Sequence, residues 1–396
     1  MTGTNPFGRA AFLRGLAEEL DPPHEQQQLA RERYEDLGEW LRRHAALTVG
    51  RDVQVYPQGS GNLGTTNLNP YTGEFDIDLV IRVGYGKWQI SQKRLNQLVN
   101  GWLGSYVRVR QQARHRLAPT KLDKGKRAWS LHYANGFHMD ILPVVPDLAS
   151  ELNASMGDPS WLTDKELIRW QPTNPRGFGD WFRKISAAEH YQRKVEAAKR
   201  AEVEVDELPD DQVKTSLQLT VQLLKRHRDH MFRDDPDRVA PPSAVITALA
   251  SQAYRTQTPS GGDLADVVNA VLDEMPNHLH RTSTSKLWVP NPTCSQENYA
   301  DRYDGRPDKE EALAEWLQQA QDDFAKVLTL RETTRVSKAI DEVFGPGFGP
   351  RIAKKLGRDT QQLRVLGALG STGTGGLSTN TSASHRPHRF YGQPDS

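Results

Sequence analysis

Residues 74–81 read EFDIDLVI, an alternation of acidic and apolar residues that is the most informative pattern in the chain. Because successive side chains of a strand point to opposite faces, Glu74, Asp76 and Asp78 share one face and the apolar residues share the other. Three carboxylates on one face repel one another and resist burial. A bound cation relieves that repulsion, and oxygen ligands favour a hard ion such as Mg²⁺, held together with substrate phosphates. We therefore predict a metal-binding strand.

A turn rich in glycine and serine precedes this strand. It contains Gln58, Gly59 and Ser60. Backbone N–H groups and the serine hydroxyl of such a turn can hold phosphates. Thr65 and Thr66 fit two roles equally, as hydroxyl contacts to the same phosphates or as ordinary turn residues.

The same glycines match the G-x-G-x-x-G fingerprint of dinucleotide-binding folds at Gly59, Gly61 and Gly64, and Asp78 follows at the expected spacing. That fold requires a crossover helix between the two features. The intervening residues 65–73 are rich in turn-forming residues and too few for such a helix. The sequence therefore argues against nicotinamide-dependent chemistry.

A third acid lies on a predicted β-hairpin. Residues 129–133 and 137–144 are typical of two strands, with a tight turn at 134–136. Asp140 lies among apolar residues of the second strand, where a carboxylate is costly unless it is paired or bound to a metal. If the hairpin lies beside the acidic strand, the three acids can hold two ions about 3.5–4 Å apart, an arrangement that clamps an in-line phosphoryl transfer.

Each acid alone has a plainer interpretation, an exposed sheet face for Asp76 and Asp78 and a salt-bridged core acid for Asp140. The specific signal is the order of three features, a Gly-Ser turn, an Asp-x-Asp strand and a later strand with one Asp. This order resembles that of the DNA-polymerase-β-type nucleotidyltransferases. It resembles still more closely the bacterial cGAS/DncV-like nucleotidyltransferases, or CD-NTases.

Downstream segments extend the resemblance over roughly residues 25–335. They are an Asn-Pro-x-Gly segment at 174–177, a basic helix around Lys225, and two segments at 241–249 and 289–301. The resemblance implies an α+β fold. It would consist of a polymerase-β-like core of mixed sheet and helices, a helical C-terminal half, and a central active-site cleft between the two lobes.

The resemblance also implies roles for individual residues. Three acids would be catalytic and would bind Mg²⁺, or Mn²⁺ in its place, and a lysine would reach the donor triphosphate. On helix statistics alone, a basic helical face in solvent explains that lysine equally well. The implied catalytic and metal-binding residues are Asp76, Asp78 and Asp140, and the implied nucleotide-binding residues are Gln58, Gly59, Ser60 and Lys225.

Members of this family make cyclic or linear oligonucleotide second messengers from nucleoside triphosphates such as ATP, and in anti-phage (CBASS) signalling the messenger activates an effector protein. The resemblance implies the same function here. A nucleotidyltransferase that modifies a macromolecule, such as a tRNA or a partner protein, is the alternative. The sequence leaves open the bases, the linkage, ring closure, the activating signal, and which of Tyr71, Tyr133 and Trp288 stacks on a base.

The chain has 396 residues and a net charge of +1, enough length for a sizeable core in one or two domains. Balanced charge speaks against bulk nucleic-acid coating and mildly against a docked macromolecular acceptor. No apolar run approaches the roughly 18 residues of a membrane helix, and the N-terminus lacks a signal-peptide core. The single cysteine, Cys294, excludes an internal disulfide and a cysteine-rich zinc site. We expect a monomeric, cytoplasmic protein with no membrane partner.

Pattern changes divide the chain into four parts, a lead at 1–22, a part at 23–160, a helical part at 161–345 and an extension at 346–396. The resemblance implies that residues 23–160 form the nucleotidyltransferase core with a long bracing helix, and that the helical part completes the nucleotide pocket. From residue 367 the chain is rich in Gly, Ser and Thr, which predicts disorder. Its end is either frayed or a peptide that a regulatory partner engages. We expect helices at 10–20, 24–47, 92–107, 164–170, 179–200, 210–232, 242–254, 262–276, 309–329 and 334–344.

Overall fold

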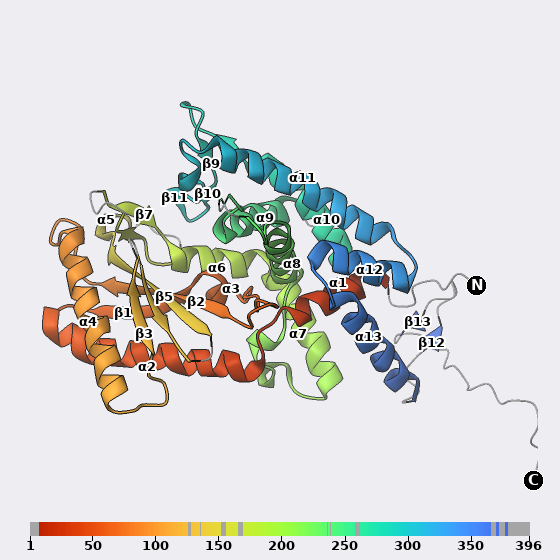
Figure 1. Ribbon diagram of the computed structural model, residues 1–396, viewed down its shortest axis with the longest axis horizontal. Helices are drawn as coiled ribbons and strands as arrows, with labels where there is room; N and C mark the ends of the chain where they lie inside the picture. Colours follow the sequence, from red (N-terminus) through yellow and green to blue (C-terminus); the bar gives the residue numbers. More distant parts are fainter. Residues whose placement is uncertain are drawn as a thin grey trace, which may run out of the picture.

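The chain is divided into two halves that lie side by side in the computed structural model (Figure 1), a β-sheet with helices against it and a part built of helices. Each half has its own cluster of buried apolar side chains. The α+β class expected from the sequence is confirmed. The structure describes residues 8–365, apart from 126–127, 135, 152–155, 165–168, 236, 238 and 258–261, together with residues 370–371 and 377–378.

A seven-stranded mixed sheet forms the first half. Its order is β1-β2-β5-β4-β3, and β6 pairs with both β5 and β7. The β2–β5 pair is parallel, whereas the other pairs are antiparallel. Strands β4 and β5 form the predicted hairpin. Because β5 also pairs with β2, the hairpin lies directly beside the acidic strand. The strands are β1 (Val53–Gln58), β2 (Phe75–Val83), β3 (Lys121–Lys124), β4 (Trp129–His132), β5 (Phe137–Pro146), β6 (Ser160–Leu162) and β7 (Gln171–Thr173).

Helices α2 (His24–Val49) and α4 (Gln92–Gln112) pack against the sheet (Figure 1). Leu37 of α2 and Leu95 of α4 are fully buried in one apolar cluster with Leu79 of β2. Because successive side chains of a strand point to opposite faces, the acidic side chains of β2 point away from this apolar cluster. The packing of the sheet therefore fixes the face on which the acids appear.

Helix α8 (Ser216–Met231) runs through the second half and is mostly buried. A capping box defines its start, because the Thr215 hydroxyl accepts from the Gln218 N–H while the Gln218 side chain accepts from the Thr215 N–H. The helix predicted at 210–232 therefore begins six residues later than the sequence suggested.

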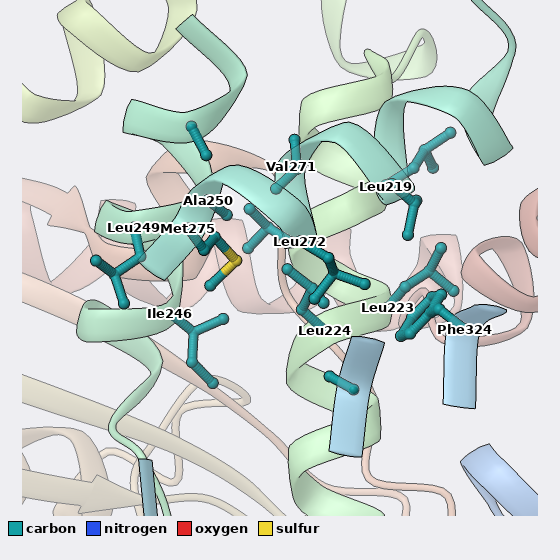
Figure 2. Packing of buried hydrophobic residues seen from close by; sticks show 14 of the residues in the cluster. Leu219, Leu223, Leu224, Ile246, Leu249, Ala250, Val271, Leu272, Met275 and Phe324 are labelled. Carbon is teal, nitrogen blue, oxygen red and sulfur yellow. The ribbon is translucent and has the colours of Figure 1, made fainter. Parts of the chain in front are cut away.

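The core of the helical half forms where α8 meets α9 (Ser243–Gln257) and α10 (Leu264–Glu274). Figure 2 shows leucines of α8 among apolar side chains of the two other helices. These side chains recur at the three- and four-residue spacing of a helix face. Burial of that face makes α8 a rigid support for the polar residues on its other sides.

Both ends of the described chain add a helix to this half. Phe12 and Leu16 of α1 (Gly8–Glu19) are fully buried, and so is Ile352 of α13 (Phe348–Val365). The two helices pack against each other, and α1 also contacts α8 and α10. They come from the segments that the sequence assigned to the lead and the extension. Local sequence does not reveal which elements a terminal helix packs against, because those elements lie hundreds of residues away along the chain.

Other predicted helices appear with altered ends. The helix predicted at 179–200 is two helices, α6 (Pro175–Ile185) and α7 (Ala187–Ala201). Residues 165–168 of the helix predicted at 164–170 lie outside the described residues, as does most of the tail beyond 367. None of the described helices is both long and apolar enough to cross a bilayer. The remaining elements are α3 (Gly59–Leu63), α5 (Leu148–Glu151), α11 (Pro307–Thr329), α12 (Thr333–Phe344), β8 (His280–Arg281), β9 (Leu287–Trp288), β10 (Pro290–Asn291), β11 (Cys294–Asn298), β12 (Gly370–Ser371) and β13 (Leu377–Ser378).

The burial of α1 predicts that Leu16→Ala destabilises the protein. Leu16 is fully buried, so truncation should cost about 2–5 kcal/mol of transfer and cavity energy. Thermal or urea unfolding should show an earlier transition. Leu47→Ala is the matched control, because Leu47 of α2 is 86% exposed and such a surface change should stay within about 0.5 kcal/mol. Equal effects of the two variants would contradict the packing of α1 into the core.

Candidate functional site

The predicted acids meet on two neighbouring strands. Asp76 and Asp78 lie on β2 and Asp140 on β5, and the parallel register pairs Asp78 with Asp140 and Asp76 with His138. Side chains at paired positions of adjacent strands point to the same face. The three carboxylates therefore share the sheet face that points away from α2 and α4.

These acids line a cleft of about 960 Å³ whose walls come from both halves of the molecule. The sheet half supplies β1, β2, β5 and α3, and the helical half supplies α6, α8 and α9. Glu74 and Thr66 also line this cleft. The structure thus brings together all the site residues expected from the sequence, namely Gln58, Gly59, Ser60, Asp76, Asp78, Asp140 and Lys225.

Burial and repulsion act together on the acids. Burial, reinforced by Asp140 and Asp76, raises the pKa of Asp78 to about 7. Burial and Asp140 also raise the pKa of Asp76. The Ser130 hydroxyl of β4 donates to Asp140 Oδ1 at 2.5 Å, and His138 Nδ1 lies 3.6 Å from Asp76 Oδ1. The protein alone therefore offsets only part of the negative charge gathered here.

The chemistry of the donor set fits a hard divalent cation. All three side chains offer carboxylate oxygens, which are the ligands that Mg²⁺ prefers. Among the residues that the structure describes, no three His, Cys, Asp or Glu side chains are already close enough together to hold a metal ion. Burial, and after it the repulsion from Asp140 and Asp76, raises the pKa of Asp78, and a cation beside these carboxylates would favour their charged forms and offset both effects.

Gly59 is tightly packed against this carboxylate cluster. It begins α3 with φ +58°, in the left-handed region that glycine adopts without strain. A Cβ at this position would collide with Asp78 Oδ2. The neighbouring Ser60 hydroxyl accepts from Thr66 Oγ1 at 3.3 Å and faces the cleft. The expected Gly-Ser turn is therefore a short helical turn pressed against the acidic strand.

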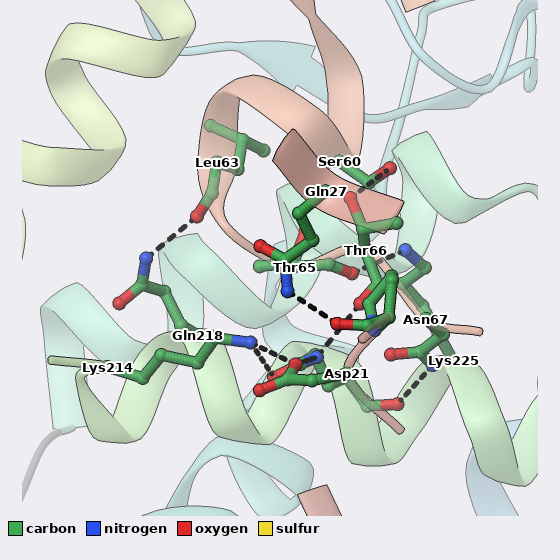
Figure 3. A network of polar contacts seen from close by, with 12 residues as sticks. Asp21, Gln27, Ser60, Leu63, Thr65, Thr66, Asn67, Lys214, Gln218 and Lys225 are labelled. Atoms are coloured by element: carbon green, nitrogen blue, oxygen red, sulfur yellow. Dashed lines mark hydrogen bonds and ion pairs between the residues drawn. The ribbon is translucent and has the colours of Figure 1, made fainter. Parts of the chain in front are cut away.

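Helix α8 holds the segment that follows this turn (Figure 3). Lys225 Nζ donates to the Thr65 carbonyl at 2.9 Å, and Gln218 Nε2 donates to the Leu63 carbonyl at 2.9 Å. Lys225 is 7% exposed, and burial, together with the charge of Arg228, lowers its pKa to about 8. A solvated basic face, the alternative left open by the sequence, does not describe this buried lysine at the cleft.

Sequence reasoning did not anticipate how many basic residues share the cleft. Arg226, Arg228, Arg233 and Arg302 all line it. Arg226 Nη2 donates to the Tyr71 hydroxyl at 3.1 Å, which links α8 to the cleft rim. The first two arginines stand next to Lys225 in the sequence and could have been inferred from it. Arg302 comes from a distant segment, and no local pattern connects it with the site.

The aromatic residues considered for base stacking are placed differently from one another. Tyr71 lines the cleft, whereas Tyr133 is buried in the core of the sheet half. Trp288 lies on β9 and is not among the cleft-lining residues. Phe178 and Tyr299 line the cleft instead. Both belong to the helical half, whose folding onto the sheet cannot be deduced from local sequence.

A half-buried carboxylate, that of Glu297, fixes the Asn-Pro-x-Gly segment. Glu297 accepts hydrogen bonds from Thr173 Oγ1 at 2.8 Å, from the Asn174 backbone N–H at 3.1 Å and from Asn291 Nδ2 at 2.7 Å. The Asn174 side chain in turn accepts from the Gly177 N–H at 3.0 Å and caps α6. This segment therefore owes its position at the cleft to a residue more than a hundred positions away.

No protein-family model matches the chain. Two relatives are similar to it over most of their length. A c-di-GMP synthase of Roseivirga ehrenbergii is 27% identical over 278 residues, which is 69% of this chain and 68% of the relative. The cyclic dinucleotide synthase CdnG of Bradyrhizobium diazoefficiens is 25% identical over 307 residues, which is 74% of this chain and 70% of the relative.

The chain has the fold of solved CD-NTases. It is similar to B. diazoefficiens CdnG solved in complex with GTP, with a TM-score of 0.67 and 22% identity over 88% of this chain and 99% of that chain. It is also similar to Vibrio cholerae DncV solved with the linear intermediate pppA(3′,5′)pG, with a TM-score of 0.55 and 15% identity over 87% of this chain and 96% of that chain.

The contact between Gly59 and Asp78 predicts that Gly59→Ala disables the site without unfolding the protein. The new methyl group displaces the carboxylate, and misplacement of about 1 Å can lower turnover on the order of 100-fold. Gly50→Ala is the matched control, because Gly50 has φ +61° and its added Cβ would meet nothing within 4 Å. Steady-state turnover and thermal unfolding of both variants check the prediction. Equal activity of the two would refute the role of this contact.

Proposed function

We propose that this protein is a CD-NTase that joins nucleoside triphosphates into a cyclic oligonucleotide, or its linear form, in a reaction that depends on a divalent cation. The observation that carries the proposal is the pairing of Asp78 with Asp140 on parallel strands, with Asp76 beside them in the wall of a cleft. Such a cluster costs stability in the absence of a cation. Its presence next to a Gly-Ser turn and a buried lysine supports a site for cation-bound phosphates.

The named relatives support nucleotides as substrates. One is a c-di-GMP synthase, CdnG was solved with GTP, and DncV was solved with a linear dinucleotide intermediate. The cleft of about 960 Å³ lies at the upper end of the roughly 300–1,000 Å³ range of small-molecule pockets. This size is consistent with a donor and an acceptor nucleotide bound together. We infer a dinucleotide product, with ATP and GTP as the first substrates to test.

Asp76, Asp78 and Asp140 would hold the cation, Mg²⁺ by preference or Mn²⁺ in its place. When bound, it neutralises phosphate charge and lowers the pKa of the attacking ribose hydroxyl. Ser60 and the backbone of its turn bind the donor phosphates, and Lys225 places a positive charge on the opposite wall. The two halves thus orient the donor between them.

The reaction is an in-line displacement at the α-phosphorus of the donor. A ribose hydroxyl oxygen of the acceptor forms the new P–O bond, its proton passes to water, and the bond to the bridging oxygen breaks. Pyrophosphate leaves with that electron pair. Positioning and charge neutralisation supply most of the rate gain. A second displacement between the same two nucleotides closes the ring.

The product would serve as a second messenger in anti-phage (CBASS) signalling, where it activates an effector protein. We propose that the enzyme acts in the cytoplasm as a monomer. A regulatory partner that engages the tail beyond residue 367 fits the same proposal. Modification of a tRNA or a protein remains the competing function, and an assay with triphosphates alone separates the two.

The proposal predicts a phosphatase-resistant product when the protein is incubated with Mg²⁺ and all four labelled triphosphates. Chromatography and mass spectrometry after phosphatase treatment identify its bases. Asp76→Ala should remove the product while the protein stays folded, because the change removes a proposed metal ligand and relieves repulsion. Chelation of the divalent cation should have the same effect. Undiminished synthesis by Asp76→Ala would sink the metal assignment, and labelling of an added tRNA or protein alone would favour the competing function.

The position of Lys225 predicts that Lys225→Met raises KM for triphosphate more than it lowers kcat. The substitution keeps the aliphatic stem and removes one positive charge from the cleft wall that is proposed to face the donor phosphates. This loss should raise KM about tenfold. Lys326→Met is the matched control, because that lysine is 53% exposed and pairs with Glu342 on the helical surface. An unchanged KM in Lys225→Met would leave this lysine with a purely structural role.

A further inference from the structure

Asp21 and Lys214 lie side by side near the segment that follows the Gly-Ser turn (Figure 3), and Gln222 hydrogen-bonds to both of them, so that the three form a polar cluster. Asp21 lies between α1 and α2, Lys214 precedes α8, and Gln222 is inside α8. Gln222 is fully buried. Burial also lowers the pKa of Lys214, although Asp21 acts in the opposite direction. Two segments separated by about two hundred residues thus meet near the segment that follows the turn.

The amide of Gln222 has one possible orientation. Its Nε2 donates to Asp21 Oδ1 at 2.7 Å and to the Thr66 carbonyl at 3.0 Å. Its Oε1 accepts from Lys214 Nζ at 3.0 Å, and Lys214 also pairs with Asp21. A reversed amide would place its oxygen against two acceptors and its N–H groups against an ammonium. The surrounding charges therefore lock this side chain.

The locked amide acts on the segment that carries Thr66. The Gln222 side chain binds the Thr66 carbonyl, and the Gln222 backbone carbonyl accepts from Asn67 Nδ2 at 2.9 Å. Thr66 Oγ1 in turn donates to Ser60 Oγ at 3.3 Å. A continuous series of hydrogen bonds thus runs from Asp21 through Gln222 and Thr66 to Ser60.

We propose that Asp21, Lys214 and Gln222 are positioning residues for the phosphate-binding turn of this enzyme. The inference rests on the proposed function, in which Ser60 and its turn bind the donor phosphates. The Lys214 and Asp21 side chains are 22% and 28% exposed, and partly exposed ion pairs contribute little to stability. Asp21 and Lys214 border a second cavity of about 880 Å³, which residues 61–64 and Thr66 of the turn segment also line. The main effect of the cluster is therefore on the geometry of the turn.

Gln222→Met tests the proposal, because it keeps the length of the side chain and removes its three hydrogen bonds. We expect the Kd for GTP in the presence of Mg²⁺ to rise about tenfold, equivalent to about 1.4 kcal/mol. Gln321→Met is the matched control, since Gln321 Nε2 also donates to a main-chain carbonyl, that of Leu272 at 3.0 Å, away from the cleft. Calorimetric titration of the full-length protein gives Kd, and thermal unfolding gives stability. Equal Kd values for the two variants would overturn the proposal.

Asp21→Asn provides a second, milder variant that keeps shape and removes charge. It should raise the Kd for GTP about threefold, and it decides the proposal if Gln222→Met fails to fold. In the double variant the two changes should not be additive, because both act through the same amide. An unchanged Kd in Asp21→Asn, or full additivity, would overturn the positioning role. Wild-type protein that binds GTP but makes no dinucleotide would refute the proposed function, while the comparison of Kd values among the variants would stay valid. Wild-type protein that binds no triphosphate would overturn both the proposed function and the positioning role.

Discussion

The site in this structure depends on two carboxylates that cannot move apart. Asp78 and Asp140 are paired on central parallel strands, and the alternate residues of those strands are buried against α2 and α4. The backbone therefore cannot move to relieve their repulsion without breaking the core. Relief has to come from groups that approach the exposed face, namely the Ser130 hydroxyl, the charge of Lys225 and a cation. The cleft is the space in which these groups act.

The sheet half contributes mainly acidic residues to that space and the helical half mainly basic ones, although Asp229 and Glu297 of the helical half also line the cleft. The sheet supplies the acids, and α8 supplies Lys225, Arg226 and Arg228 on the facing wall. The segment after the Gly-Ser turn has little core of its own and depends on α8, through Gln218, Gln222 and Lys225, for its hydrogen bonds. The segment that follows the Gly-Ser turn of the sheet half is thus held in place by the helical half. Any relative movement of the halves would change the site.

The features that the sequence predicted correctly are those with short-range signals. The alternation in residues 74–81 predicted β2, and the turn at 134–136 predicted the hairpin that carries Asp140. Packing between distant segments left no such signal. The contact of Asn67 with Gln222 spans 155 positions, and the burial of α1 depends on α13 at the other end of the chain. The sequence itself showed the order of the site residues, the family resemblance implied their roles, and only the structure supplied the contacts that hold them.

The net charge of +1 conceals a strong local separation of charge in the cleft. The acidic wall alone would repel a triphosphate, and the basic wall alone could bind one too far from the acids to react. A cation on the acidic wall removes the first difficulty, because phosphate oxygens can then complete its coordination. The donor would then bridge the two walls, with one end near the acids and the other near α8. Cation and triphosphate should therefore stabilise each other in the cleft, so that neither occupies its productive position without the other.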